Sequence, residues 1–221
     1  MEIKDAIKQR HSVRNYLDKP IEEEKVNILL KEIEKINKEN DLNIQLVLND
    51  KDAFDTMLAH YGKFTNAVNY FALVGKKCRD LEEKCGYFGE KLVLLSQMSG
   101  LNTCWVALTF SKKKNRITIN EDEKLVCVIC VGYGATQGNN HKIKTFEQVT
   151  KNAQNSPLWF KDGVQAALLA PTSLNQQKFC FSIENNKVRV QRKWGHYTKI
   201  DLGIVKYHFE IGADLTDYVW E

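Results

Sequence analysis

The sequence has little proline, little net charge and no long apolar run, and each shortage excludes a class of protein. Only three prolines occur in 221 residues, and no Pro- or Ser-rich linker interrupts the chain, which favours one domain over residues 1–221. No apolar run approaches the length of a membrane span, so we expect no membrane association. The net charge is only +4, and lysines alternate with glutamates, as in residues 31–35. This pattern is typical of a solvated helix surface and gives no support for nucleic-acid binding.

The N-terminus and the cysteines are consistent with a cytoplasmic protein. Met1 is followed directly by a charged amphipathic stretch with no apolar core of a signal peptide, so we expect cytoplasmic localisation. The six cysteines then need no disulfide partners. Cys127 and Cys130 form a C-x-x-C, but they lie in a β-branched apolar run, where residues i and i+3 point to opposite faces of a strand. Packing is therefore favoured over a metal or dithiol site.

Hydrophobic periodicity predicts helices that alternate with short strands, which is an α+β pattern. The expected helices cover residues 2–11, 22–36, 52–60, 86–99, 157–170 and 201–215. The expected strands cover residues 43–48, 69–75 and 125–132, and a hairpin is expected over 179–183 and 187–192. The order helix, strand, helix occurs twice, first over residues 22–99 and again over residues 157–215. We call this weak internal repeat the internal echo.

Several residues mark helix ends. Ser156 is the expected N-cap of the helix near residue 157, with Pro157 at its first position. Asp201 is expected to cap the last helix. Gly100 is expected to end the apolar helix over residues 86–99. His208 lies on the inner stripe of the last helix, so it is expected to be a packed histidine.

A cluster with two arginines and a hydroxyl follows the first expected helix. Arg10, Ser12 and Arg14 lie within five residues, together with His11. The planar guanidinium of arginine suits phosphate oxygens, and charge-assisted hydrogen bonds are strong. The alternative is a helix C-terminus whose basic residues interact with the helix dipole. The cluster alone leaves the two readings even.

A second polar cluster is Ala-Pro-Thr-Ser-Leu-Asn-Gln-Gln, at residues 170–177. Pro171 stops the preceding helix, and small polar groups follow before an apolar strand. Such a loop offers several donors and acceptors to one ligand edge. An ordinary polar turn would look the same, so this cluster is also weak alone.

Together the two clusters resemble the nitroreductase (flavin reductase) family, through R-x-S-x-R near the N-terminus and A-P-[ST]-x-x-N-x-Q before a strand. Gly-Leu-Asn-Thr-Cys-Trp at residues 100–105 resembles the family's segment after its central helix. Val-Gly-Tyr-Gly at 131–134, followed by Lys142 and Lys144, resembles its late strand and basic segment. The resemblance implies a nitroreductase-like α+β fold, with a central antiparallel or mixed sheet flanked by helices, and FMN as the cofactor.

The resemblance also implies roles for residues. Arg10 and Ser12 would contact the FMN phosphate and ribityl chain, and Lys142 and Lys144 would complete the phosphate grip. Arg14 would lie near the pyrimidine edge of the flavin, where a positive charge stabilises the reduced anion. The remaining residues implied to lie at the cofactor are His11, Thr103, Cys104, Trp105, Pro171, Thr172, Ser173, Asn175 and Gln177.

The implied reaction transfers hydride from NAD(P)H through FMN to a nitroaromatic, quinone or similar acceptor. The flavin performs the chemistry, so no protein nucleophile and no metal is required. Two alternatives stay open: a flavin-binding protein with little or no turnover, and a different reaction such as reductive dehalogenation.

One departure from the family pattern bears on assembly. The A-P-[ST]-x-x-N-x-Q motif of the family usually comes early, whereas here it follows a late helix, and Lys178-Phe179 replaces the usual Pro-Trp. The family is usually an intertwined homodimer. The displaced motif and the internal echo lead to the hypothesis that one chain mimics the dimer, with unequal pseudo-repeats over about 1–150 and 151–221. A monomer of this kind and a homodimer both stay open.

Overall fold

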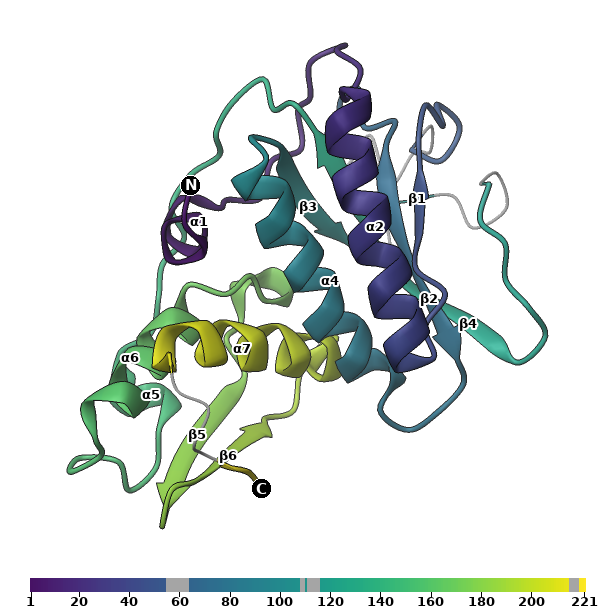
Figure 1. Ribbon diagram of the computed structural model, residues 1–221. Coiled ribbons are helices and arrows are strands. Elements are labelled where there is room, and N and C mark those ends of the chain that lie inside the picture. Colours follow the sequence, from purple (N-terminus) through teal and green to yellow (C-terminus); the bar gives the residue numbers. More distant parts are fainter. Residues whose placement is uncertain (55–63, 108–109, 111–115, 215–218) are drawn as a thin grey trace. The chain divides into compact units, whose positions relative to one another are not determined.

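The computed structural model describes residues 1–54, 64–107, 110, 116–214 and 219–221 (Figure 1). The chain divides into two compact units. The first unit contains Met1, residues 9–81 and residues 91–139. The second contains residues 2–8, 82–90 and 140–221.

The first unit is built on an antiparallel four-stranded sheet. Its strands stand in the order β1 (Gln45–Val47), β2 (Tyr70–Lys76), β4 (Glu123–Gly132) and β3 (Asn102–Val106). Strands β2 and β4 are central, and both contain a long apolar run, over residues 70–75 and 125–132; every residue of β2 except Lys76 is buried. The register pairs Cys104 of β3 with Cys130 of β4.

Helix α2 (Glu23–Asn40) packs along the β1–β2 side of this sheet (Figure 1). Its buried stripe is Leu29, Ile33 and Ile36, at helical spacing, while most of its lysines and glutamates are exposed. Residues 91–98 of α4 (Leu81–Met98) belong to the same unit, and Lys91 pairs with Glu32 of α2 at 2.7 Å. Gly100 ends α4 with a left-handed φ of 76°, as expected from the sequence.

The C-x-x-C lies within β4. Cys130 packs in the same buried cluster as Val128 and Cys104, and the alternation of the strand turns Cys127 to the other face. Both cysteines are buried and neither is in a disulfide. Among the described residues no group of side chains could hold a metal ion.

The second unit has a three-stranded sheet and a set of helices. The sheet runs in the order β5 (Phe179–Glu184), β6 (Lys187–Arg192), β7 (Val219–Trp220), with β5 and β6 antiparallel and β6 and β7 parallel. The expected hairpin is confirmed, and its turn residues Asn185 and Asn186 both have positive φ. The helices are α1 (Ile3–Gln9), α5 (Phe146–Val149), α6 (Leu158–Leu168) and α7 (Thr198–Ala213).

Stacked and edge-on aromatic rings fill the core of the second unit. Phe209 of α7 stacks on Phe181 at 5.0 Å between ring centroids and meets Phe160 of α6 at 5.7 Å. His208, fully buried as expected, has its Nε2 2.8 Å from Oε1 of Glu90 and its Nδ1 3.1 Å from the carbonyl oxygen of Ala166. The side chain of His208 therefore ties residue 90 of α4 to α6.

The α+β class is confirmed, but three details of the sequence-based prediction are corrected or left open. Helix α6 begins at Leu158, because Pro157 has an extended ψ of 160° and is itself the N-cap, so Ser156 is not. Helix α7 begins at Thr198, one turn earlier than expected, so Asp201 lies inside it and cannot cap it. Residues 52–54 of the expected helix over 52–60 form a bend and a turn, and residues 55–60 lie outside the described residues.

Candidate functional site

The segment that carries Arg10, Ser12 and Arg14 is extended and held by its backbone. After α1 ends at Gln9, the N–H of Val13 donates to the carbonyl of Thr103 at 3.0 Å. The N–H of Tyr16 donates to the carbonyl of Thr65 at 3.0 Å. These bonds fix the segment beside the edge strand β3, so its side chains start from a defined backbone position.

Two arginines and a hydroxyl of this segment gather near Cys104 of β3. Burial raises the pKa of the Cys104 thiol, while the positive charges of Arg14 and Arg10 and a hydrogen bond with Ser12 oppose that rise. Arg10 is 4% exposed, whereas Arg14 and Ser12 are exposed. The thiol therefore stays protonated at neutral pH and is not a nucleophile.

Strand β3 divides its motif residues between two faces. Cys104 and Val106 belong to the buried cluster of the first unit, so Thr103 and Trp105 point to the opposite face. Thr103 is 3% exposed and Trp105 is half-buried. The carbonyl of Thr103 also accepts the hydrogen bond from Val13, so the motif at residues 100–105 lies beside the motif at residues 10–14.

A loop over residues 133–138 lies beside the segment of residues 10–14 and is held by the side chain of Asn102. The sequence did not predict this role of Asn102. The side-chain oxygen of Asn102 accepts the N–H of Gly134 at 3.0 Å, and its Nδ2 donates to Gln137 at 3.1 Å. Gly138 has a φ of 77°, and a Cβ there would lie 2.6 Å from Cβ of His11. The position of Asn102 inside the Gly100–Trp105 motif was the available signal, but its role depends on contacts distant in sequence.

The second polar cluster is a strained loop in the second unit. It runs from Pro171 and Thr172 through the 3-10 turn η1 (Ser173–Asn175) to Gln177. Leu174, Asn175 and Gln177 all have a left-handed φ, of 51°, 52° and 46°. Such conformations cost free energy in residues other than glycine and persist only where other contacts fix them.

Gln177 supplies many of those contacts. Its side chain is 2% exposed, and Nε2 donates to the carbonyl of Lys142 and to Oδ1 of Asn175, both at 2.8 Å. Its Oε1 accepts the N–H of Lys144 at 2.8 Å, and its own N–H donates to the hydroxyl of Thr172 at 3.1 Å. One buried amide thus joins residues 142–144 to the strained loop.

The ammonium group of Lys144 forms hydrogen bonds within this loop. Its Nζ donates to the carbonyls of Gln176 and Gln177, both at 2.8 Å. Burial lowers its pKa, and the charges of Lys193 and Lys178 lower it further. Lys144 therefore stabilises carbonyls of the loop in this structure, a contact that the sequence did not suggest.

Asp201 of α7 holds the other end of the loop. Its carboxylate accepts the N–H of Ser173 at 2.9 Å and Nε2 of Gln176 at 3.2 Å. Burial raises its pKa from 3.8 to about 6, although both hydrogen bonds oppose the rise. Sequence reasoning gave Asp201 the role of a helix cap, and the structure makes it a support of the polar loop.

The expected site residues thus form two groups. Arg10, His11, Ser12, Arg14, Thr103, Cys104 and Trp105 belong to the first unit. Lys142, Lys144, Pro171, Thr172, Ser173, Asn175 and Gln177 belong to the second.

Within the described residues, no helix is long and apolar enough to cross a membrane.

Comparisons with known proteins agree on one family. The family model described as "Putative TM nitroreductase" matches residues 2–213. A crystal structure of a "putative nitroreductase" from Thermotoga maritima superposes with a TM-score of 0.70 at 22% identity, covering 96% of this chain and 83% of that chain.

More distant structures match a smaller share of the chain. One from Bacteroides thetaiotaomicron, named a "Putative NADH dehydrogenase/NAD(P)H nitroreductase", has a TM-score of 0.54 at 23% identity and covers 68% of this chain and 96% of that one. A "putative nitroreductase in complex with fmn" from Desulfovibrio desulfuricans has a TM-score of 0.52 at 16% identity, with coverage of 72% and 98%. No match was found among curated proteins.

Proposed function

The chain belongs to the family described as "Putative TM nitroreductase", and on this premise we propose that it is an FMN-dependent oxidoreductase. It passes hydride from NAD(P)H to a nitroaromatic, quinone or similar small acceptor. Bound FMN supplies the hydride chemistry, while the protein binds and orients the reactants. A structural relative from Desulfovibrio desulfuricans is a complex with FMN, which supports this choice of cofactor.

The observation that carries the proposal is the donor set around Cys104. Two guanidinium groups, Arg10 and Arg14, and the hydroxyl of Ser12 gather beside β3, near Cys104. This set fits a phosphate monoester, because arginine binds phosphate oxygens through two parallel N–H groups and a hydroxyl adds a further donor. We assign the FMN phosphate and ribityl chain to Arg10 and Ser12, and the flavin's pyrimidine edge to Arg14.

The strained loop of the second unit gives separate support. Three left-handed residues within four positions, held by a buried glutamine, are more than an ordinary turn requires. Strain of this kind is found at ligand-binding and catalytic segments. We assign the ring-lining role to Pro171, Thr172, Ser173 and Asn175, with Gln177 as the residue that fixes their backbone.

The first test is the affinity for FMN of an Arg10→Ala variant. We expect FMN binding to weaken by about 100-fold, since charge-assisted hydrogen bonds to phosphate are lost. Arg10 is nearly buried, so Arg10→Lys, which keeps the charge, and a thermal melt of each variant show whether the fold survives. Arg79→Ala, at an exposed arginine, is the matched control. Unchanged FMN affinity in Arg10→Ala would refute the phosphate assignment.

The second test separates an oxidoreductase from a passive flavin protein. The protein is reconstituted with FMN and desalted, and its visible spectrum is recorded before and after NADH or NADPH is added without oxygen. We expect the flavin to be retained and its absorbance to bleach. Retained flavin that does not bleach would contradict the oxidoreductase assignment, and loss of the flavin would contradict FMN binding itself.

A further inference from the structure

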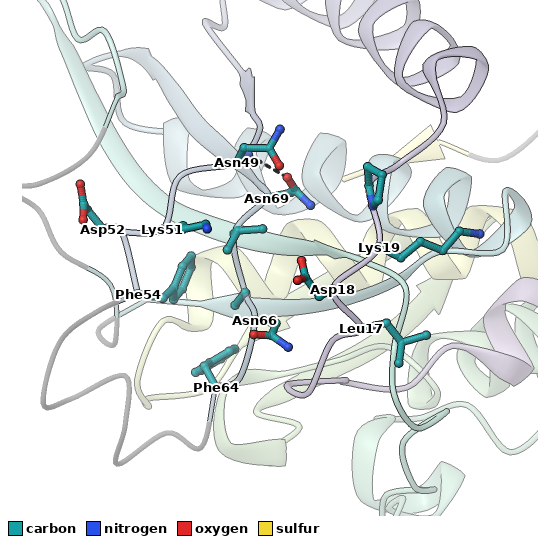
Figure 2. A pocket seen from close by; sticks show the side chains of 13 residues that line it. Leu17, Asp18, Lys19, Asn49, Lys51, Asp52, Phe54, Phe64, Asn66 and Asn69 are labelled. Carbon is teal, nitrogen blue, oxygen red and sulfur yellow. Dashed lines mark hydrogen bonds between the residues drawn. The ribbon is translucent and has the colours of Figure 1, made fainter.

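The first unit has a hollow of about 520 Å³, but its charged lining favours no class of ligand (Figure 2). Asp18 and Asp52 line it together with Lys19 and Lys51, so an anion and a cation would each face a like charge. The loop between β6 and α7 in the second unit is different. It combines a large exposed aromatic ring with surroundings that carry charge of one sign.

Trp194 of this loop has its side chain in solvent. It is 91% exposed, which is the largest exposed fraction among the described large apolar side chains. The backbone of the loop is nevertheless fixed by hydrogen bonds. The N–H of Lys193 donates to the carbonyl of Lys178 at 2.7 Å, and Nε2 of Gln176 donates to the carbonyl of His196. The indole is therefore presented to solvent from a defined backbone position, at a cost in hydrophobic free energy.

Two further exposed apolar side chains stand on the same segments. Leu174, on the segment to which the loop is bonded, is 85% exposed and has a left-handed φ of 51°. Tyr197 is 37% exposed and has a left-handed φ of 55°. This backbone conformation is costly for bulky residues and persists only where other contacts fix it. We call Leu174, Trp194 and Tyr197 the Trp194 surface; grouped apolar exposure of this kind marks binding surfaces.

The segments that build this surface carry positive charges only. Residues 142–144, 174–178 and 192–199 contain no aspartate or glutamate, and their basic residues are Lys142, Lys144, Lys178, Arg192, Lys193 and Lys199. Burial lowers the pKa of Lys144, and the nearby charges of Lys193 and Lys178 lower it further. Lys178 is exposed and forms no ion pair with another described residue. The surface therefore suits a ligand that combines a planar aromatic ring with negative charge.

We propose that the Trp194 surface binds the nucleoside diphosphate part of the hydride donor. The aromatic base stacks on the indole of Trp194, and the diphosphate is bound by the ammonium groups of Lys178 and Lys193. Stacking of this kind accepts any base, because every base has a π-face, and lysine binds phosphate as a point charge. The inference rests on the proposed function, since NAD(P)H is the nucleoside diphosphate that this function uses.

The position of the surface fits this assignment. Gln176 bonds the loop of Trp194 to the polar loop that we assign to the flavin ring. Both parts of one dinucleotide therefore have a place in the second unit, the nicotinamide at the polar loop and the nucleoside diphosphate at Trp194. Neither Trp194 nor Lys178 is among the residues assigned to FMN.

The first test measures binding to the full chain without flavin, so it depends neither on FMN nor on turnover. Titration calorimetry compares ADP with adenosine, which lacks the charges, and with pyrophosphate, which lacks the ring. We expect a Kd for ADP on the order of 1 mM or tighter, and binding weaker by about tenfold for either analogue. ADP should also quench tryptophan fluorescence, and Trp194→Leu should remove this quenching. Absence of ADP binding would overturn the proposal.

Variants at exposed positions test the two contacts without disturbing the core. Trp194→Ala and Lys178→Met should each weaken ADP binding by about tenfold, while Trp194→Phe, which keeps an aromatic ring, should retain most of the affinity. Lys35→Met, at an exposed lysine of α2, is the matched control and should bind ADP unchanged. Equal binding of ADP and pyrophosphate, with no effect of Trp194→Ala, would overturn the proposal and identify a plain anion patch. Self-association that Trp194→Ala abolishes would overturn it in favour of an interface between copies of the chain.

The last test uses the FMN-loaded chain and separates this inference from the proposed function. Trp194→Ala should raise the KM for NADH by about tenfold and leave kcat nearly unchanged. Reduced nicotinamide mononucleotide, which lacks the adenylate part, should be used equally well by the variant and the original chain. An unchanged KM for NADH would overturn this inference and leave the oxidoreductase assignment intact. A flavin that does not bleach in the original chain would instead contradict the proposed function.

Discussion

At the scale of single residues, Asp201 determines how the polar loop of the second unit responds to pH. Its pKa of about 6 in the folded protein lies above the ordinary aspartate value of 3.8, and burial is the main cause. The folded state therefore binds more protons than the unfolded state between about pH 4 and pH 6, and stability decreases as pH rises through this window. At neutral pH the ionised carboxylate costs up to a few kcal/mol, since one pKa unit is about 1.4 kcal/mol.

We expect an Asp201→Asn variant to remove this pH dependence. Asparagine keeps an oxygen that can accept the N–H of Ser173 but carries no charge. The unfolding free energy of the variant relative to the original chain should therefore increase between about pH 4 and pH 7. Urea unfolding at several pH values measures the difference. A difference that stays constant with pH would show that Asp201 does not titrate in this range.

The sequence located many of the polar residues but few of their contacts. Arg10, Ser12 and Gln177 could be selected because their spacing matches a known pattern. The supports could not be selected, because Asn102 and Asp201 act on segments about 30 residues away. Local capping rules even assigned Asp201 the wrong role, since a helix start is easily misplaced by one turn.

At the scale of elements, α7 and the first half of α4 pack through glycines. A Cβ added at Gly203 would lie 2.0 Å from the carbonyl oxygen of Glu83, and one at Gly86 would lie 2.1 Å from that of Ile200. Both neighbours are helix backbone, which cannot move aside as a side chain can. The two helices therefore approach each other at a distance that only glycine permits.

We expect Gly203→Ala to destabilise the protein by about 3 kcal/mol or more, despite the better helix propensity of alanine, because overpacking against backbone forces the helices apart. Gly75→Ala is the matched control, since its Cβ would come closer than 3.0 Å only to terminal methyl groups of Leu42 and Leu81. Chemical unfolding of both variants measures the effect. A stability loss in Gly203→Ala no greater than in the control would contradict the close packing.

Single helices and strands were easier to predict than the assembly of the strands into sheets, for a physical reason. The stripe of α2 is a local pattern of one segment, and the hairpin of β5 and β6 is set by its own turn. The division of the strands into two sheets depends on pairings distant in sequence, such as β6 with β7, which is only two residues long. The four-residue helix α5 was also missed, because it is too short to show periodicity.

At the scale of the whole molecule, each of the two segments proposed to bind the flavin occurs once in the chain. Arg-His-Ser-Val-Arg lies at residues 10–14 and Ala-Pro-Thr-Ser-Leu-Asn-Gln-Gln at 170–177, and neither is repeated. An ordinary family member places both motifs early and completes its site with a second subunit. The late second motif instead supports the hypothesis of a pseudo-dimer, in which one chain is sufficient for one cofactor.

We expect one FMN per chain, bound by a monomer. Light scattering of the reconstituted protein should give a mass near the 25.5 kDa of one chain, and flavin absorbance after dialysis should give about one FMN per chain. The mass should not change with protein concentration, because no second subunit takes part in binding. Arg10→Ala should lower the flavin content without changing the mass. A tight dimer that retains two FMN molecules would contradict the pseudo-dimer and would favour the intertwined assembly of ordinary family members.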